Sequence, residues 1–202
     1  DLIIRFGRKP TSKVLSKLLE KWKIFTFLVD PWQKLNDDCP NFIQSSIGNY
    51  CRRQVQNTKW KGSSNWVKEL LSLETIVKNE IQKEMIIHEG IIAKVCFESI
   101  GEGGHIFVGN SMPIRDVDMF TSASDKKISI FSNRGASGID GLIASACGYS
   151  SGMQKPVTLL IGDLSALHDL NSFKLLADSL EPVLLVLLNN HGGGIFSFLP
   201  IA

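Results

Sequence analysis

Apolar and polar positions follow one another in blocks along the chain, and each block predicts a strand or a helix. Short apolar runs predict strands at 2–6, 24–29, 105–108, 128–131, 157–161 and 183–188. Apolar residues three or four positions apart predict helices over 11–22, 66–85, 91–99 and 166–180. A small-residue stretch predicts a helix over 137–150, and another helix is expected after Pro113. Residues 36–62 are polar and mixed, and we expect an irregular connection there with at most one short strand.

Strands that alternate with helices indicate an α/β fold with a doubly wound parallel sheet. We expect one α/β segment over 1–62, connecting helices over 63–102 and a second α/β segment over 103–202. The sequence opens at Asp1 and stops at Ala202, shortly after a strand, and we expect it to be a piece of a longer protein.

Composition narrows the class of partner. The 202 residues carry a formal net charge of +2 and no basic run, which argues against nucleic acid as the main partner. No apolar run approaches the ~18 residues of a membrane span. The four cysteines form no CxxC pair, so we interpret them as reduced thiols, and a zinc site is not expected.

Two polar residues follow the last two predicted strands. Asp163 comes after the strand 157–161 and Asn190 comes after the strand 183–188, with a predicted helix between them. The carboxyl ends of parallel strands meet at the edge where open α/β sheets bind ligands. A carboxylate and an amide oxygen suit Mg²⁺, which commonly takes phosphate oxygens as further ligands. The pattern therefore predicts a magnesium–diphosphate site.

The residues around this pair resemble a known superfamily. Gly162-Asp163, followed after a helix by Asn189-Asn190, is similar to the motif of thiamin-diphosphate enzymes. Leu164 departs from the general motif, which has glycine there, but is typical of one family within it. Three further segments resemble that family: 108–115, 132–141 and 192–200. It is the MenD family, the 2-succinyl-5-enolpyruvyl-6-hydroxy-3-cyclohexene-1-carboxylate synthases of menaquinone and phylloquinone biosynthesis.

The resemblance, densest over 103–202, implies a fold and an activity. It implies that 1–62 is the C-terminal part of a Rossmann-like middle domain and that 103–202 is the N-terminal part of the diphosphate-binding domain. The implied activity is a transferase that decarboxylates 2-oxoglutarate and adds the succinyl carbanion to isochorismate, with thiamin diphosphate and Mg²⁺ (or Mn²⁺). The family's pyrimidine-binding domain and its catalytic glutamate lie outside these residues, so we expect the 202-residue chain alone to be inactive.

The resemblance also implies roles for individual residues. Metal ligands would be Asp163, Asn190 and the main-chain carbonyl of Gly192. The cofactor would also meet Gly162, Leu164, Ser165, Ser137 and Ile139, with Ile139 supporting its bent form. Arg115 and Arg134 would act in catalysis by holding substrate carboxylates, because a guanidinium forks onto a carboxylate. The remaining candidates for substrate contact are Ser111, Lys13, Ile195, Phe196 and Leu199.

Alternatives stay open at this point. The chain could come from another thiamin-diphosphate decarboxylase or carboligase, or be a truncated, non-catalytic remnant. Arg115 and Arg134 argue against a monocarboxylate substrate. Asp163 alone could be a helix cap and Lys13 a surface cation. The resemblance implies a homodimer or homotetramer and, if the protein comes from a plant, a plastid location; otherwise we expect the cytoplasm.

Overall fold

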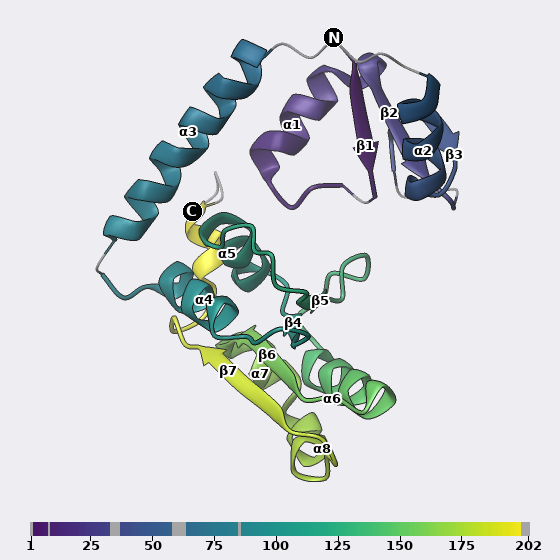
Figure 1. Cartoon of the computed structure of the whole chain (residues 1–202). Helices are drawn as coiled ribbons and strands as arrows, with labels where there is room; N and C mark the ends of the chain where they lie inside the picture. Colours follow the sequence, from purple (N-terminus) through teal and green to yellow (C-terminus); the bar gives the residue numbers. More distant parts are fainter. Residues whose placement is uncertain (1, 8, 33–36, 58–63, 85, 199–202) are drawn as a thin grey trace. The chain divides into compact units, whose positions relative to one another are not determined.

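The computed structural model describes residues 2–7, 9–32, 37–57, 64–84 and 86–198. The chain divides into two units, Asp1–Glu74 and Thr75–Ala202 (Figure 1). The boundary falls within the long helix α3 (Ser64–Lys83). No helix in the described ranges is long and apolar enough to cross a bilayer.

The first unit contains a three-stranded parallel sheet. Its strands are β1 (Ile3–Phe6), β2 (Thr26–Asp30) and β3 (Asn41–Gln44), in the order β1-β2-β3. Helix α1 (Lys13–Lys21) connects β1 to a 3₁₀ turn, Lys23–Phe25, and then to β2. Ser12 caps α1 by accepting the backbone N–H of Leu15 at 3.2 Å, as its position before the helix predicts.

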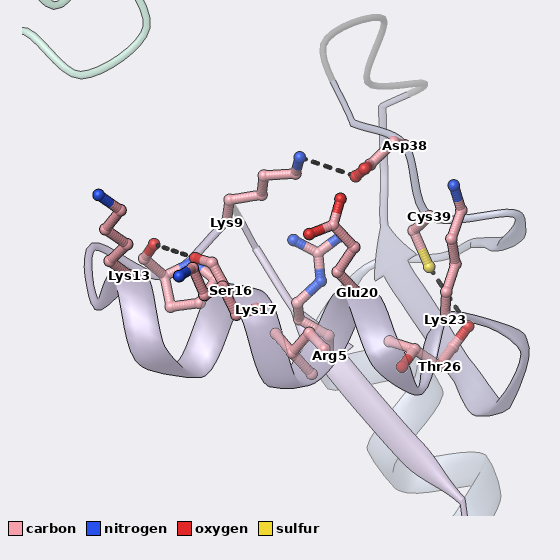
Figure 2. A pocket seen from close by; sticks show the side chains of 12 residues that line it. Arg5, Lys9, Lys13, Ser16, Lys17, Glu20, Lys23, Thr26, Asp38 and Cys39 are labelled. Carbon is pink, nitrogen blue, oxygen red and sulfur yellow. Dashed lines mark hydrogen bonds and ion pairs between the residues drawn. The ribbon is translucent and has the colours of Figure 1, made fainter. Parts of the chain in front are cut away.

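A groove of about 220 Å³ runs beside α1 in this unit (Figure 2). Arg5 of β1 lies in it, forms an ion pair with Asp37 and is almost enclosed by the fold. Lys9 pairs with Asp38 at 2.8 Å, but both side chains are half exposed, so this pair adds little stability.

One sequence expectation for this unit is wrong. The sequence predicts an irregular connection with at most one short strand over 36–62; β3 is that strand, but the helix α2 (Ile47–Asn57) was not predicted. Most side chains of α2 face solvent, and its sequence is largely polar. Its apolar residues Ile47, Tyr50, Cys51 and Val55 do recur at helical spacing, a usable signal that the polar residues around them obscured.

The second unit contains a four-stranded sheet, all of whose pairs are parallel. The spatial order is β5-β4-β6-β7. In chain order, its strands are β4 (His105–Val108), β5 (Ser129–Phe131), β6 (Val157–Gly162) and β7 (Val183–Leu188). The α-helices described in this unit after α3 are α4 (Glu89–Glu98), α5 (Met112–Phe120), α6 (Leu142–Met153), α7 (Asp163–His168) and α8 (Phe173–Ala177).

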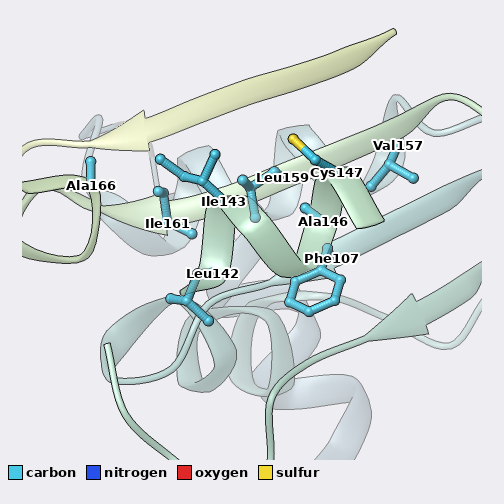
Figure 3. Close-up of a cluster of buried hydrophobic side chains, with 9 residues drawn as sticks. All are labelled: Phe107, Leu142, Ile143, Ala146, Cys147, Val157, Leu159, Ile161 and Ala166. Atoms are coloured by element: carbon cyan, nitrogen blue, oxygen red, sulfur yellow. The ribbon is translucent and has the colours of Figure 1, made fainter. Parts of the chain in front are cut away.

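Helices cover both faces of this sheet. Alternate residues of a strand point to opposite faces, so Ile106 and Val108 pack with α4 and α5, whereas Phe107 packs with α6. The α6 side is built from nine buried side chains (Figure 3), namely Phe107, Leu142, Ile143, Ala146, Cys147, Val157, Leu159, Ile161 and Ala166. This is the α/β arrangement, with helices on both faces of a parallel sheet, that the alternation of elements predicts.

Two predicted helices have different limits in the structure. The helix expected over 137–150 begins only at Leu142, because Gly141 adopts a left-handed conformation with φ of 64°. The helix expected over 166–180 is broken into α7, a 3₁₀ turn at Leu170–Ser172 and α8. The break falls at Asp169, whose backbone leaves the helical region.

Asp169 explains both differences. Its carboxylate accepts the backbone N–H groups of Ile143 at 2.7 Å and Ala144 at 3.2 Å, and also the hydroxyl of Ser172. Gly141 offers no side chain to cap α6, so the carboxylate of Asp169 satisfies two of its unpaired N–H groups. A negative charge at a helix N-terminus also interacts favourably with the helix dipole.

Replacement of Asp169 by alanine should therefore destabilise this unit. The variant leaves buried N–H groups without an acceptor, and we expect a loss of about 2 kcal/mol in the free energy of unfolding. Chemical denaturation of the wild type and the variant measures this loss. Asp178→Ala is the matched control, since Asp178 is exposed and pairs only with exposed Lys174, and it should change stability by less than about 0.5 kcal/mol. Equal losses in the two variants would contradict the capping role.

Candidate functional site

The carboxyl ends of β6 and β7 meet at one edge of the sheet. The two strands pair in parallel, and Gly162, the last residue of β6, lies opposite Leu188, the last residue of β7. Asp163 follows Gly162 and opens α7, and Asn190 lies two residues beyond Leu188. The register therefore places the carboxylate and the amide at the same end of neighbouring strands.

A pocket of about 170 Å³ lies at this edge. Asp163 and Asn190 both line it, together with Ile139 from the segment before α6. Nine residues predicted from the sequence are among its lining residues: Ser111, Ile139, Gly162, Asp163, Leu164, Ser165, Asn190, Ile195 and Phe196. One pocket thus brings together residues from four separate segments of the chain, with oxygen donors and apolar side chains side by side.

The loop after β7 has an unusual backbone. His191, Gly192 and Gly193 have φ values of 63°, 87° and 69°, all in the left-handed region. Asn190 fixes the loop, since its side-chain oxygen accepts the backbone N–H of Gly192 at 3.1 Å. A Cβ at position 194 would come within 2.5 Å of the Asn190 amide nitrogen, so any other residue there would displace the Asn190 side chain. The glycine-rich loop keeps the backbone close to the pocket.

A second strained position, Ser111, lines the same pocket. Ser111 precedes α5 and has φ of 70°, although it is not glycine. Arg115, one turn along α5, donates from its guanidinium to the main-chain carbonyl of Ser111. Such strained residues persist only where surrounding contacts hold them, and they concentrate at functional sites.

Asn110 joins two of the predicted segments. It is 2% exposed, and its amide group donates to the carbonyl of Gly138 at 2.7 Å. Its side-chain oxygen accepts a long hydrogen bond of 3.5 Å from Arg134. Asn110 therefore ties the turn after β4 to the segment that carries Arg134 and Ile139. Its position soon after a strand, at the carboxyl edge, is the sequence signal that points to it, although no role was predicted for it.

Two acidic side chains, Glu89 and Asp116, come from the helices α4 and α5. Asp116 of α5 is 4% exposed, and Glu89, the first residue of α4, lines the pocket. Burial and the nearby charge of Glu89 raise the pKa of Asp116 to about 7, and the charge of Arg115 opposes this shift. Sequence reasoning missed both carboxyls because their relation depends on how α4 packs against α5.

Other predicted residues lie outside the pocket lining. Four of them, Arg115, Arg134, Ser137 and Gly192, do not line it themselves, although each lies within five residues of one that does. Lys13 lies in the first unit, where it lines the groove beside α1 (Figure 2). Leu199 lies outside the described residues.

The site offers mixed oxygen donors to a metal. Within the part of the chain that the structure describes, no group of three or more His, Cys, Asp or Glu side chains could hold a metal ion. Asp163 and Asn190 instead offer one carboxylate and one amide, a set that leaves positions for carbonyl and phosphate oxygens.

Relatives of this chain share one name. A protein of Oceanobacillus iheyensis is 39% identical over 210 residues, one of Bacillus velezensis is 37% identical over 209, and one of Chlorobaculum tepidum is 48% identical over 214. Each is named 2-succinyl-5-enolpyruvyl-6-hydroxy-3-cyclohexene-1-carboxylate synthase. The alignments cover 100% of this chain but 36% of each relative, so the chain spans about a third of their length.

No family model matches the chain. The assignment therefore depends on these relatives, which match it from end to end and carry the same name. Together with the α/β fold, these matches show that the chain belongs to the MenD family, the 2-succinyl-5-enolpyruvyl-6-hydroxy-3-cyclohexene-1-carboxylate synthases.

Proposed function

We propose that this chain is part of a synthase that depends on thiamin diphosphate and Mg²⁺. In this proposal the protein decarboxylates 2-oxoglutarate and joins the remaining four-carbon unit to isochorismate. The observation that carries the proposal is that Asp163, Asn190 and Ile139 line one pocket at the carboxyl edge of a parallel sheet. The name shared by the relatives supports the reaction.

The residues present fit the cofactor and the metal. Hard cations take oxygen ligands, and the pocket supplies them from Asp163 and Asn190 beside a loop whose backbone carbonyls are accessible through glycines. Ile139, Leu164 and Phe196 supply an apolar wall for a ring. Asp163, Asn190 and the Gly192 carbonyl would hold Mg²⁺, and Gly162, Leu164, Ser165 and Ser137 would meet the cofactor. When bound, thiamin diphosphate would supply the electron sink for decarboxylation.

The remaining assignments concern the substrates. Arg115 and Arg134 would bind substrate carboxylates and orient them, with Ser111 adding a hydrogen bond. Ile195 and Phe196 would pack on the isochorismate ring, a role also predicted for Leu199. Water exclusion by these apolar residues would strengthen each charge interaction in the pocket. Lys13 stays a weaker candidate for substrate contact, because it lines the groove beside α1 and not the pocket that holds Asp163 and Asn190.

The size of the pocket supports a shared site. A volume of about 170 Å³ is below the ~300 Å³ at which small-molecule sites begin, so these residues form only part of an enclosing surface. Phe196 and Phe198 are 59% and 72% exposed beside it. We propose that a homodimer or homotetramer completes the site. The three relatives named above are bacterial, so they give no support to a plastid location, and the compartment stays a prediction.

The metal assignment predicts the effect of Asp163→Ala in the full-length protein. Loss of the only carboxylate in the proposed ligand set should weaken Mg²⁺-dependent binding of thiamin diphosphate by about 100-fold or more. Titration calorimetry with and without Mg²⁺ measures this. Asp178→Ala, which removes an exposed carboxylate at the C-terminal end of α8, is the control and should bind as the wild type does. Unchanged cofactor affinity in Asp163→Ala would refute the assignment.

The carboxylate assignment predicts the effect of Arg134→Lys. Lysine keeps the charge but loses the planar fork, so KM for 2-oxoglutarate should rise about 10-fold or more while cofactor affinity stays constant. Steady-state kinetics of the full-length protein measure both quantities. Arg53→Lys, an exposed position on α2, is the matched control. A KM equal to that of the wild type would remove Arg134 from the substrate site.

A further inference from the structure

Two carboxyl groups at the pocket, those of half-buried Glu89 and buried Asp116, have no role in the proposed chemistry. Within the described residues, one carboxylate oxygen of Glu89 and one of Asp116 are buried and have no hydrogen-bond donor. A buried carboxylate oxygen without a hydrogen-bond donor costs free energy. Both oxygens are satisfied only if the two groups share a proton or if another group donates a hydrogen bond to them.

The packing of α4 against α5 brings the two groups to the same place. Gly90, next to Glu89, lies so close to α5 that a side chain there would come within 2.4 Å of the Phe120 ring. Asp116 and Phe120 are four residues apart and therefore share one face of α5. The face that carries Asp116 thus meets the start of α4, where Glu89 begins the helix.

We propose that Glu89 and Asp116 hold one proton between them at neutral pH and so keep the positive charge of Arg115 available for a substrate carboxylate. With the proton in place, Glu89, Asp116 and Arg115 carry no net formal charge. Without it, the three groups carry a net charge of −1 next to a site for anionic substrates. The choice of substrate rests on the proposed function, but the shared proton does not.

The surrounding charges agree with this arrangement. Burial and Glu89 raise the pKa of Asp116 to about 7, whereas Arg115 lowers it. An acid with a raised pKa is protonated below that value and loses its proton as pH rises through it. Helix α4 also carries Lys94 and Glu98, but neither is among the causes of the raised pKa of Asp116. Strand β6 carries no ionisable side chain. His88 accepts the N–H of Gly90, and its ring meets the Phe120 ring in an edge-to-face contact.

Asp116 would then be a positioning residue that acts through Arg115. A purely structural hydrogen bond would stabilise the contact of α4 with α5 without changing how substrate affinity depends on pH. The proposal differs because it links one proton to the charge of the pocket. Above about pH 7, ionised Asp116 would offset the guanidinium of Arg115 and weaken the binding of a dianion.

The first test observes the proton directly and needs no turnover. Carboxyl carbon-13 NMR of the full-length protein should show one carboxyl that titrates near pH 7. This titration should be missing in Asp116→Asn, and its midpoint should fall in Glu89→Gln because the neighbouring charge is lost. If Asp116 of the wild type titrates near the ordinary value of about 4, the shared proton is disproved.

The second test measures the link to the substrate. KM for 2-oxoglutarate, whose carboxylates stay ionised throughout, should rise roughly fivefold from about pH 6 to about pH 8 in the wild type. In Asp116→Asn, where the neutral amide mimics the protonated acid, this rise should disappear. Asp118→Asn, an exposed position on the same helix, should keep the wild-type profile.

The NMR titration and the KM profile can fail independently, so their outcomes distinguish the shared proton from its link to the substrate. If Asp116→Asn keeps the wild-type KM profile while the NMR titration is normal, the pair shares a proton but does not act on Arg115. If 2-oxoglutarate gives no turnover at any pH while the titration is normal, the proposed function is wrong and the shared proton stands. If Asp116→Asn does not fold, the Glu89→Gln variant tests the shared proton instead. The proposal then requires the titration midpoint of Asp116 to be lower in Glu89→Gln than in the wild type.

Discussion

The parallel pairing of β6 with β7 is the constraint on which the rest of the site depends. Six residue pairs run from Val157 opposite Val183 to Gly162 opposite Leu188, so both strands end at the same level. A shift by one residue would turn Leu159 and Ile161 away from the α6 side, where they are fully buried. The hydrophobic core therefore fixes the register, and the register places Asp163 and Asn190 at one edge.

The loops at that edge hold conformations that the core alone does not dictate. His191 to Gly193 are left-handed in succession, and Ser111, which lines the same pocket, has positive φ without being glycine. Their supports are local and polar: Asn190 accepts from Gly192, and Arg115 donates to the Ser111 carbonyl. A rigid sheet with strained polar loops at its edge is the arrangement expected where a scaffold presents a binding site.

The sequence predicts the parts of this structure that depend on local pattern. The strands β6 and β7 were placed to within one residue, because a continuous apolar run is typical of a strand buried in a parallel sheet. Asp163 and Asn190 were predicted from their positions after those strands. Helix α2 was missed because polar residues dominate its sequence and obscure the short stripe formed by Ile47, Tyr50, Cys51 and Val55.

Tertiary contacts account for the other differences. The helix expected over 166–180 is interrupted because Asp169 turns its carboxylate to the N-terminus of α6, more than 20 residues earlier in the chain. Glu89 and Asp116 could not be recognised as a pair, since only the close approach of α4 to α5 at Gly90 relates them. The most direct measurement of the central claim is a structure of the full-length protein with Mg²⁺ and thiamin diphosphate. Our account predicts that side-chain oxygens of Asp163 and Asn190 both lie about 2.1 Å from the same ion, and it is contradicted if either side chain faces away from that ion.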